Sequence, residues 1–203
     1  MNNIIMLISL IISFISIVVS IYYGITNAKI KREFKTVKWS DFPSIADFVY
    51  KKCKGNNFMP DIIFIANPAY YHIAKSILLK FNNDNILIIN GMLINKNESS
   101  VPDILKNEFH VFDTTIRHVL LPKSLFENKN NKILFVGGWV VTGNILNGIK
   151  KYLQKESIPE ENFKSFCLAT TNIAKDLNSS PDYYWKEVSV EEGLYLPWGK
   201  LIV

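Results

Sequence analysis

The sequence predicts an α/β domain with a mostly parallel sheet and flanking helices, preceded by a single transmembrane helix. Mostly apolar runs, typical of strands buried on both faces of a parallel sheet, lie at residues 62–66, 85–89, 133–136 and 163–170. Between them, apolar side chains recur at helical spacing over residues 69–81 and 144–154. This alternation indicates a parallel sheet covered by helices. The transmembrane helix is predicted from an uncharged stretch, residues 1–28.

The other segments of the domain give weaker patterns. From residue 39 a helical pattern begins, with Ile45 and Val49 on one face. Residues 94–108 are polar and predict irregular structure, and strand-like residues return at 110–121. The C-terminal part, residues 181–203, is rich in aromatic and turn residues.

Length and charge suggest how the chain is divided. Its 203 residues accommodate one α/β domain of about 150 residues and an appendage. We expect a transmembrane anchor at residues 1–28, a basic juxtamembrane linker at 29–38 and the α/β domain at 39–203. The linker carries +4 of the net charge of +5, and the rest of the chain has 18 basic and 17 acidic residues. We therefore expect no general nucleic-acid binding, and contact of the linker with anionic lipid.

The uncharged stretch has the length of a membrane span. Residues 4–25 would form a helix about 33 Å long, which matches a bilayer core. A cleavable signal peptide would have a basic start, a shorter apolar stretch and a small-residue cleavage site, so we expect a retained anchor. The basic linker that follows predicts a single-pass protein of the cell membrane with a cytoplasmic C-terminal domain. The alternative is a buried core helix of a soluble protein.

Serine side chains recur along this segment at steps of four, three and four residues. They lie on one stripe of a helix, where a second helix could approach closely: Ser9, Ser13, Ser16 and Ser20. The lipid bilayer and a second copy of the chain are thus the expected partners of the anchor. The two cysteines and three histidines of the chain have no metal-ligand spacing, and we expect no metal site and no disulfide framework.

Residues 133–146 form the strongest local pattern in the chain. An apolar run is followed by Gly137 and Gly138, and Thr142 and Gly143 then open a helical pattern. A strand, a turn of small residues and a helix N-terminus make a phosphate cradle, because free N–H groups and the helix dipole favour an anion there. The candidate phosphate-binding residues are Gly137, Gly138, Thr142, Gly143 and Asn144. The alternative is that Thr142 and Asn144 only cap the helix and that the glycines only permit a turn.

The same stretch resembles the phosphoribosyl pyrophosphate loop of type I phosphoribosyltransferases, with matches at Val136, Thr142 and Gly143. In that family two acidic residues hold the ribose hydroxyls, and the Thr-Gly segment holds the 5′-phosphate. Here the acidic positions are Gly137 and Gly138. The resemblance therefore implies that the phosphate half of the site is kept and the sugar half is lost.

Other segments extend the resemblance over residues 39–199. The family's pyrophosphate loop has Arg-Gly-Gly, where this chain has Asn67-Pro68-Ala69-Tyr70, and Pro68 removes an N–H donor. Thr170 stands where 6-oxopurine transferases have a base-contacting lysine. The C-terminal Leu196-Pro197-Trp198-Gly199 resembles the family's ending. Candidate base-pocket residues, which could equally be packing residues, are Trp139, Tyr183, Tyr184 and Trp198.

These departures all fall on groups that phosphoribosyl transfer requires. Without the acidic pair and the pyrophosphate loop, little holds the ribose, the magnesium or the leaving group, so we expect no ordinary transferase activity and assign no catalytic residue. The leading hypothesis is a membrane-anchored, non-catalytic or divergent binder of a phosphorylated small molecule or nucleotide. One alternative is an active, purine-salvage-like transferase, which would need Mg²⁺. The other is a membrane effector whose soluble domain mediates assembly.

Overall fold

The computed structural model of the protein describes residues 15–22, 35–97, 100–189 and 194–201. The chain divides into two compact units, Met1–Lys35 and Thr36–Val203. Within the first unit, residues 15–22 are helical. Most of the predicted span at residues 4–25 lies outside the described residues. Among the described residues, no helix has both the length and the apolar character needed to cross a bilayer.

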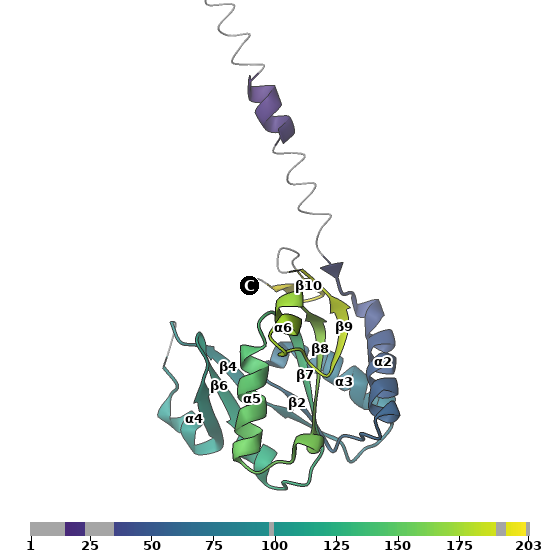
Figure 1. The fold of residues 1–203 in the computed structure, drawn as a ribbon, viewed down its shortest axis with the longest axis vertical. Coiled ribbons are helices and arrows are strands. Elements are labelled where there is room, and N and C mark those ends of the chain that lie inside the picture. Colours follow the sequence, from purple (N-terminus) through teal and green to yellow (C-terminus); the bar gives the residue numbers. More distant parts are fainter. Residues whose placement is uncertain (1–14, 23–34, 98–99, 190–193, 202–203) are drawn as a thin grey trace, which may run out of the picture. The chain divides into compact units, whose positions relative to one another are not determined.

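A parallel sheet of five strands, in the order β3-β2-β7-β8-β9, forms the centre of the second unit (Figure 1). All neighbouring pairs in it are parallel, which confirms the predicted α/β domain with a mostly parallel sheet. The strands are β2 (Ile62–Ile65), β3 (Leu87–Asn90), β7 (Ile133–Val140), β8 (Phe163–Thr170) and β9 (Tyr183–Glu187). Strand β9 lies in the C-terminal stretch rich in aromatic and turn residues, where no strand was predicted. It pairs with β8 and completes one edge of the sheet.

Helices cover both faces of this sheet and bury two separate apolar cores. On one face, α2 (Phe42–Gly55) and α3 (Tyr71–Phe81) pack through residues such as Ile45 and Ile77. On the other, α5 (Asn144–Lys155) buries Leu146, Ile149 and Leu153. These helices agree with the predicted helical patterns. Two short helices, α4 (Asp103–Glu108) and α6 (Asn172–Asp176), were not predicted.

A second, antiparallel sheet in the order β4-β6-β5 lies on the α5 side (Figure 1). It consists of β4 (Met92–Asn95), β5 (Phe109–Asp113) and β6 (Arg117–Pro122). The predicted strand region at 110–121 is thus a hairpin. The prediction of irregular structure over residues 94–108 is wrong at both ends, because residues 94–95 belong to β4, which pairs with the distant β6, and residues 103–108 form α4. A small third sheet joins β1 (Lys35–Thr36), β10 (Leu194–Leu196) and β11 (Gly199–Leu201).

The strand β7 is longer than the sequence predicted. We expected it to end at Val136 and to turn at the two glycines, but pairing with β8 continues through Gly137 and Trp139 to Val140. The predicted turn at Gly137 and Gly138 is therefore wrong, and the chain bends only at residues 141–142. Both glycines are instead places where neighbouring side chains approach the strand.

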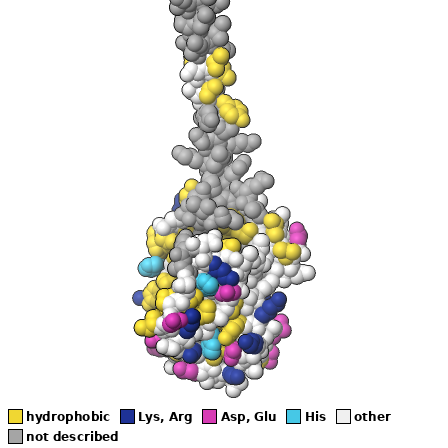
Figure 2. Space-filling model, turned by 90° about the vertical axis from the view of Figure 1, so that its left-hand side faces the viewer, with side chains coloured by type: hydrophobic (Ala, Val, Ile, Leu, Met, Phe, Trp, Pro, Cys, Tyr) yellow, Lys and Arg dark blue, Asp and Glu magenta, His cyan; other side chains and the backbone are white. Residues whose placement is uncertain are grey.

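Charged side chains of both signs are interspersed on the face of the molecule that Figure 2 shows. One local example within the antiparallel sheet is Asp113. Its carboxylate lies 2.7 Å from His118 Nδ1 and 3.2 Å from Lys96 Nζ. Such exposed pairs contribute little to stability.

Candidate phosphate site at the carboxyl edge of the sheet

The carboxyl ends of β2 and β7 lie side by side, because the two strands are parallel neighbours. Ligands of open α/β sheets bind beyond these ends. The chain leaves β2 into the 3-10 helix η2 (Pro68–Tyr70) and leaves β7 into the bend before α5. The predicted phosphate and pyrophosphate segments therefore meet at one edge of the sheet.

The first turn of α5 has no side-chain cap. Its N-cap is Gly143, with φ of +77°, and the first helical hydrogen bond runs from Asn147 N–H to Gly143 O at 2.8 Å. Among the hydrogen bonds of the described residues, none involves the side chain of Thr142 or Asn144. The structure therefore does not support the alternative in which these two residues cap the helix. The N–H groups of the first turn are left for water or an anion.

Two neighbouring helix starts at the same edge are capped. Asn67 Oδ1 accepts a hydrogen bond from Ala69 N–H at 2.9 Å in η2, and Thr171 Oγ1 accepts one from Ala174 N–H at 3.2 Å in α6. Each cap satisfies an N–H that would otherwise face the edge. Only the segment from β7 thus combines the family's Thr-Gly pair with uncapped N–H groups.

The bend before α5 is held in place by a second segment. A Cβ added to Gly143 would lie 2.5 Å from Ser179 O and closer still to Ser179 Cβ. The Ser179 hydroxyl also accepts a hydrogen bond from Asn147 Nδ2 at 2.9 Å. Only glycine fits here, because the positive φ and this close contact both oppose a side chain.

The two positions that are acidic in transferases have no room for a carboxylate. A Cβ on Gly138 would overlap the hydroxyl of Tyr70, and a Cβ on Gly137 would lie 2.8 Å from Phe135 Cε1 and 3.0 Å from Cys167 Sγ. Burial raises the pKa of the Tyr70 hydroxyl well above its usual range, and the Arg117 guanidinium offsets only part of this effect. Tyr70 therefore stays protonated and neutral beside the strand.

The loop after β2 offers few N–H groups to a pyrophosphate. Pro68 has none, Ala69 N–H is bonded to Asn67 Oδ1, and Tyr70 N–H is bonded to Asn67 O at 3.0 Å. These amides complete a local turn. The segment that we compared with the pyrophosphate loop is thus a closed 3-10 turn.

A cavity of about 90 Å³ lies between the ends of β2 and β7 and the start of α5. Its lining is mostly apolar: Ala66, Tyr70, Leu93, Phe135, Trp139, Val140, Ile145, Leu146 and Cys167, together with Asn67, Gly137 and Gly138. No carboxylate is among these residues. Mg²⁺ requires oxygen ligands and is usually bound through carboxylates, so this lining does not fit the metal that phosphoribosyl transfer uses.

The candidate base-pocket residues are not all brought together. Trp139 lines the cavity, and its buried indole N–H has no partner among the described residues. The ring of Trp198 lies 6.0 Å from that of Tyr70. Tyr183 instead accepts a hydrogen bond from Asn56 Nδ2 at 3.2 Å, and Lys175 lies over the ring of Tyr184.

Thr170, which the sequence resemblance matched to a base-contacting lysine, ends β8. It is fully buried, and its hydroxyl has no partner within the described part of the chain. A buried hydroxyl cannot replace the reach or the charge of a lysine side chain.

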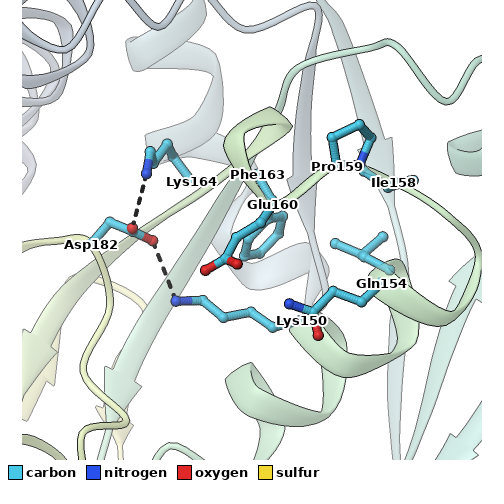
Figure 3. A pocket seen from close by; sticks show the side chains of 9 residues that line it. Lys150, Gln154, Ile158, Pro159, Glu160, Phe163, Lys164 and Asp182 are labelled. Carbon is cyan, nitrogen blue, oxygen red and sulfur yellow. Dashed lines mark ion pairs between the residues drawn. The ribbon is translucent and has the colours of Figure 1, made fainter.

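A second hollow, of about 50 Å³, lies at the opposite, amino end of β8 (Figure 3). Asp182 dominates it: this carboxylate accepts hydrogen bonds from Ser165 N–H at 2.9 Å and Ser165 Oγ at 2.5 Å. It also pairs with Lys150 at 3.6 Å and Lys164 at 3.5 Å. Burial raises the pKa of Asp182, but the Ser165 hydrogen bonds and the two lysines outweigh it, and the pKa is lowered. Through these contacts Asp182, which lies just before β9, connects to both β8 and α5.

The structural role of Tyr70 was not recognised in the sequence. The signal was nevertheless present, since a bulky residue at position 70 coincides with glycines at both acidic positions. Residue 70 follows closely after the end of β2, the parallel neighbour of β7, and this placement would have brought the new side chain near the missing ones. The cavity could not be predicted, because it depends on how the distant Leu93 packs from β4.

Comparison with solved structures identifies this arrangement. A purine phosphoribosyltransferase from Pyrococcus horikoshii aligns with a TM-score of 0.55 at 15% identity, over 84% of this chain and 97% of that one. The chain has the type I phosphoribosyltransferase fold. A xanthine-guanine-hypoxanthine phosphoribosyltransferase from Helicobacter pylori aligns with a TM-score of 0.51 at 17% identity. This alignment covers 81% of this chain and 91% of that one. A hypothetical protein from Neisseria gonorrhoeae with bound ppGpp aligns with a TM-score of 0.55 at 13% identity, over 81% of this chain and 89% of that one.

No protein-family profile matches the sequence, and no curated protein matches it. The phosphoribosyltransferase fold is therefore shared at low identity, which establishes architecture and leaves the function to be argued from the site.

Proposed function

We propose that this protein is a membrane-anchored, phosphoribosyltransferase-like protein that binds a phosphorylated ligand at the start of α5 without transferring a ribose. The proposal depends on the uncapped first turn of α5 beside the Thr142-Gly143 bend. A helix N-terminus with free N–H groups favours a phosphate through both hydrogen bonds and the helix dipole. The ppGpp bound to the similar protein from Neisseria gonorrhoeae supports a phosphorylated ligand on this fold.

The absence of transfer follows from the positions that surround the bend. Tyr70 takes the space at Gly138, and the turn at Asn67 uses the N–H groups that would meet a pyrophosphate. Transfer needs groups that hold the ribose and stabilise the charge of the leaving pyrophosphate. The described residues at this edge supply neither.

The anchor is proposed from the sequence. Residues 4–25 are uncharged and long enough for a bilayer core, and the basic linker at 29–38 favours a cytoplasmic domain. A domain held at the membrane in this way would sample phosphorylated ligands of the cytoplasm. The serine stripe adds a second copy of the chain as the proposed partner of the anchor.

Calorimetry of the full chain in lipid nanodiscs tests the proposal. Phosphoribosyl pyrophosphate, ppGpp, ribose 5-phosphate and inorganic phosphate are titrated separately, with empty nanodiscs as the blank. Asn144→Glu places a carboxylate on the first residue of α5, and we expect binding to weaken at least tenfold. The matched control is Asn172→Glu, because Asn172 is also an exposed first helical residue, but of the capped helix α6. It should bind like the unmodified chain.

Three results would overturn the proposal. Loss of affinity in both variants, or no heat with any of the four ligands, would remove the phosphate site. Release of pyrophosphate from phosphoribosyl pyrophosphate with a panel of purine bases, abolished by Thr142→Ala, would instead show an active transferase.

A further inference from the structure

The cavity beside the start of α5 is apolar where a sugar-binding site would be polar. Phe135 and Leu93 line it from two different sheets, and Ile145 and Leu146 line it from the first turn of α5. The apolar space therefore adjoins the same helical turn whose N–H groups lack a side-chain cap. An anionic group and a hydrocarbon group of one small molecule could occupy the two parts together.

We propose that the ligand is a phosphate monoester of a short hydrocarbon chain rather than a nucleotide. This inference rests on the proposed phosphate site and adds the chemical class of the group attached to the phosphate. The phosphate would be held by the first turn of α5, and the hydrocarbon would enter the cavity. The pairing of an oxyanion site with an apolar cavity is what distinguishes such an ester from a sugar phosphate.

The lining offers a ribose few polar groups: Asn67, and the indole N–H of Trp139, which has no partner among the described residues. Each ribose hydroxyl that enters an apolar cavity without a partner loses its hydrogen bonds to water. The residues that hold these hydroxyls in transferases are absent, since Gly137 and Gly138 carry no side chain and Tyr70 fills the space at Gly138. A hydrocarbon has no such cost and gains about fourfold in affinity for each methylene that it buries.

The volume of the cavity limits the length of the hydrocarbon chain that it can hold. An apolar cavity of about 150 Å³ in a protein core holds one benzene molecule. The cavity here, of about 90 Å³, is smaller and partly open, so we assign it a chain of about four carbons. Longer chains would extend out of the cavity.

The test compares n-butyl phosphate with glycerol 3-phosphate and inorganic phosphate, on the full chain in nanodiscs with empty nanodiscs as the blank. We expect n-butyl phosphate to bind at least tenfold more tightly than either of the others. In an alkyl series, affinity should rise from methyl to butyl phosphate and level off at hexyl phosphate. This series requires no variant, so it holds even if a substitution disturbs folding.

A cavity-filling variant and a matched control variant give a second test of the cavity. Leu93→Trp should fill the cavity and reduce the preference for n-butyl phosphate to less than threefold, while inorganic phosphate binds as before. Ile94→Trp changes the next residue of β4, which points to the other face of that strand, and should keep the preference.

The outcomes separate this inference from the proposed function. Equal affinity for n-butyl phosphate and glycerol 3-phosphate, with both weakened by Asn144→Glu, would refute the hydrocarbon class and leave the phosphate site standing. Tighter binding of phosphoribosyl pyrophosphate or ppGpp than of n-butyl phosphate would refute it as well. No binding of any phosphate would overturn both.

Discussion

At the scale of single residues, Tyr70 and Gly138 compete for one space. The Tyr70 hydroxyl lies where a side chain at position 138 would begin, and its burial keeps it neutral. A transferase needs a carboxylate at that position, so the tyrosine and the carboxylate exclude each other. The absence of a side chain at position 138 therefore fits the packing of η2 against β7.

The substitution Gly138→Asp tests this competition. We expect it to lower the free energy of unfolding by about 3 kcal/mol, because it overpacks the strand and buries a charge. Adding Tyr70→Ala should recover part of that loss, with a coupling of about 1–3 kcal/mol in a double-mutant cycle. Urea unfolding of the full chain in detergent micelles, followed by near-ultraviolet circular dichroism, measures all four proteins. Gly55→Asp is the control, since no atom lies within 4 Å of its Cβ position.

Asp182 gives a second prediction at this scale. Asp182→Ala should lower the free energy of unfolding by about 2 kcal/mol at pH 7, because it leaves the fully buried Ser165 without its acceptor. The lowered pKa of the folded state means that the carboxylate stabilises the fold above about pH 4, and that this contribution is lost as pH falls further. The difference between the two proteins should therefore shrink in acid. Asp103→Ala removes an exposed aspartate that also pairs with a lysine, and it should leave stability unchanged.

At the scale of elements, the junction of β7 and α5 depends on Gly143. Gly143→Ala should destabilise the protein by about 2 kcal/mol, because alanine opposes the positive φ and collides with Ser179. The same change at Gly55, near the end of α2, meets no neighbour and should be neutral or slightly stabilising. Urea unfolding measures the free energy of unfolding of both variants. An equal loss at the two glycines would contradict the assigned role of Ser179.

Elements specified by their own local sequence pattern could be predicted, and elements that depend on distant contacts could not. The buried strands β2 and β8 and the helix α5 carry their own periodicity, and their predicted positions agree with the structure within a few residues. Strand β4 was missed because its pairing partner β6 lies far along the chain. Strand β7 was cut short because glycines in a strand look like a turn until the side chains that need the space, Tyr70 and Phe135, are placed beside them.

At the scale of the whole molecule, scaffold and site are separable. Two apolar cores, one on each face of the parallel sheet, hold the second unit together, and most of their buried residues lie away from the carboxyl edge. The edge can therefore change while the fold persists, as the likeness to purine phosphoribosyltransferases at 15–17% identity illustrates. The candidate site could be located from the sequence because strand order fixes where the edge lies. The side chains that fill the site could not be predicted, because their positions depend on packing between distant strands.

The proposed topology gives the last prediction. Both native thiols are buried, and burial raises the pKa of Cys53 to about 12, so neither should react with a membrane-impermeant maleimide in the folded protein. A single added cysteine then reports its own side of the membrane. Asn2→Cys should be labelled in intact cells, whereas Ser44→Cys, an exposed position on α2, should be labelled only after the membrane is opened. Labelling of both in intact cells, or loss of the chain from the membrane fraction at alkaline pH, would rule out a single-pass anchor with a cytoplasmic domain.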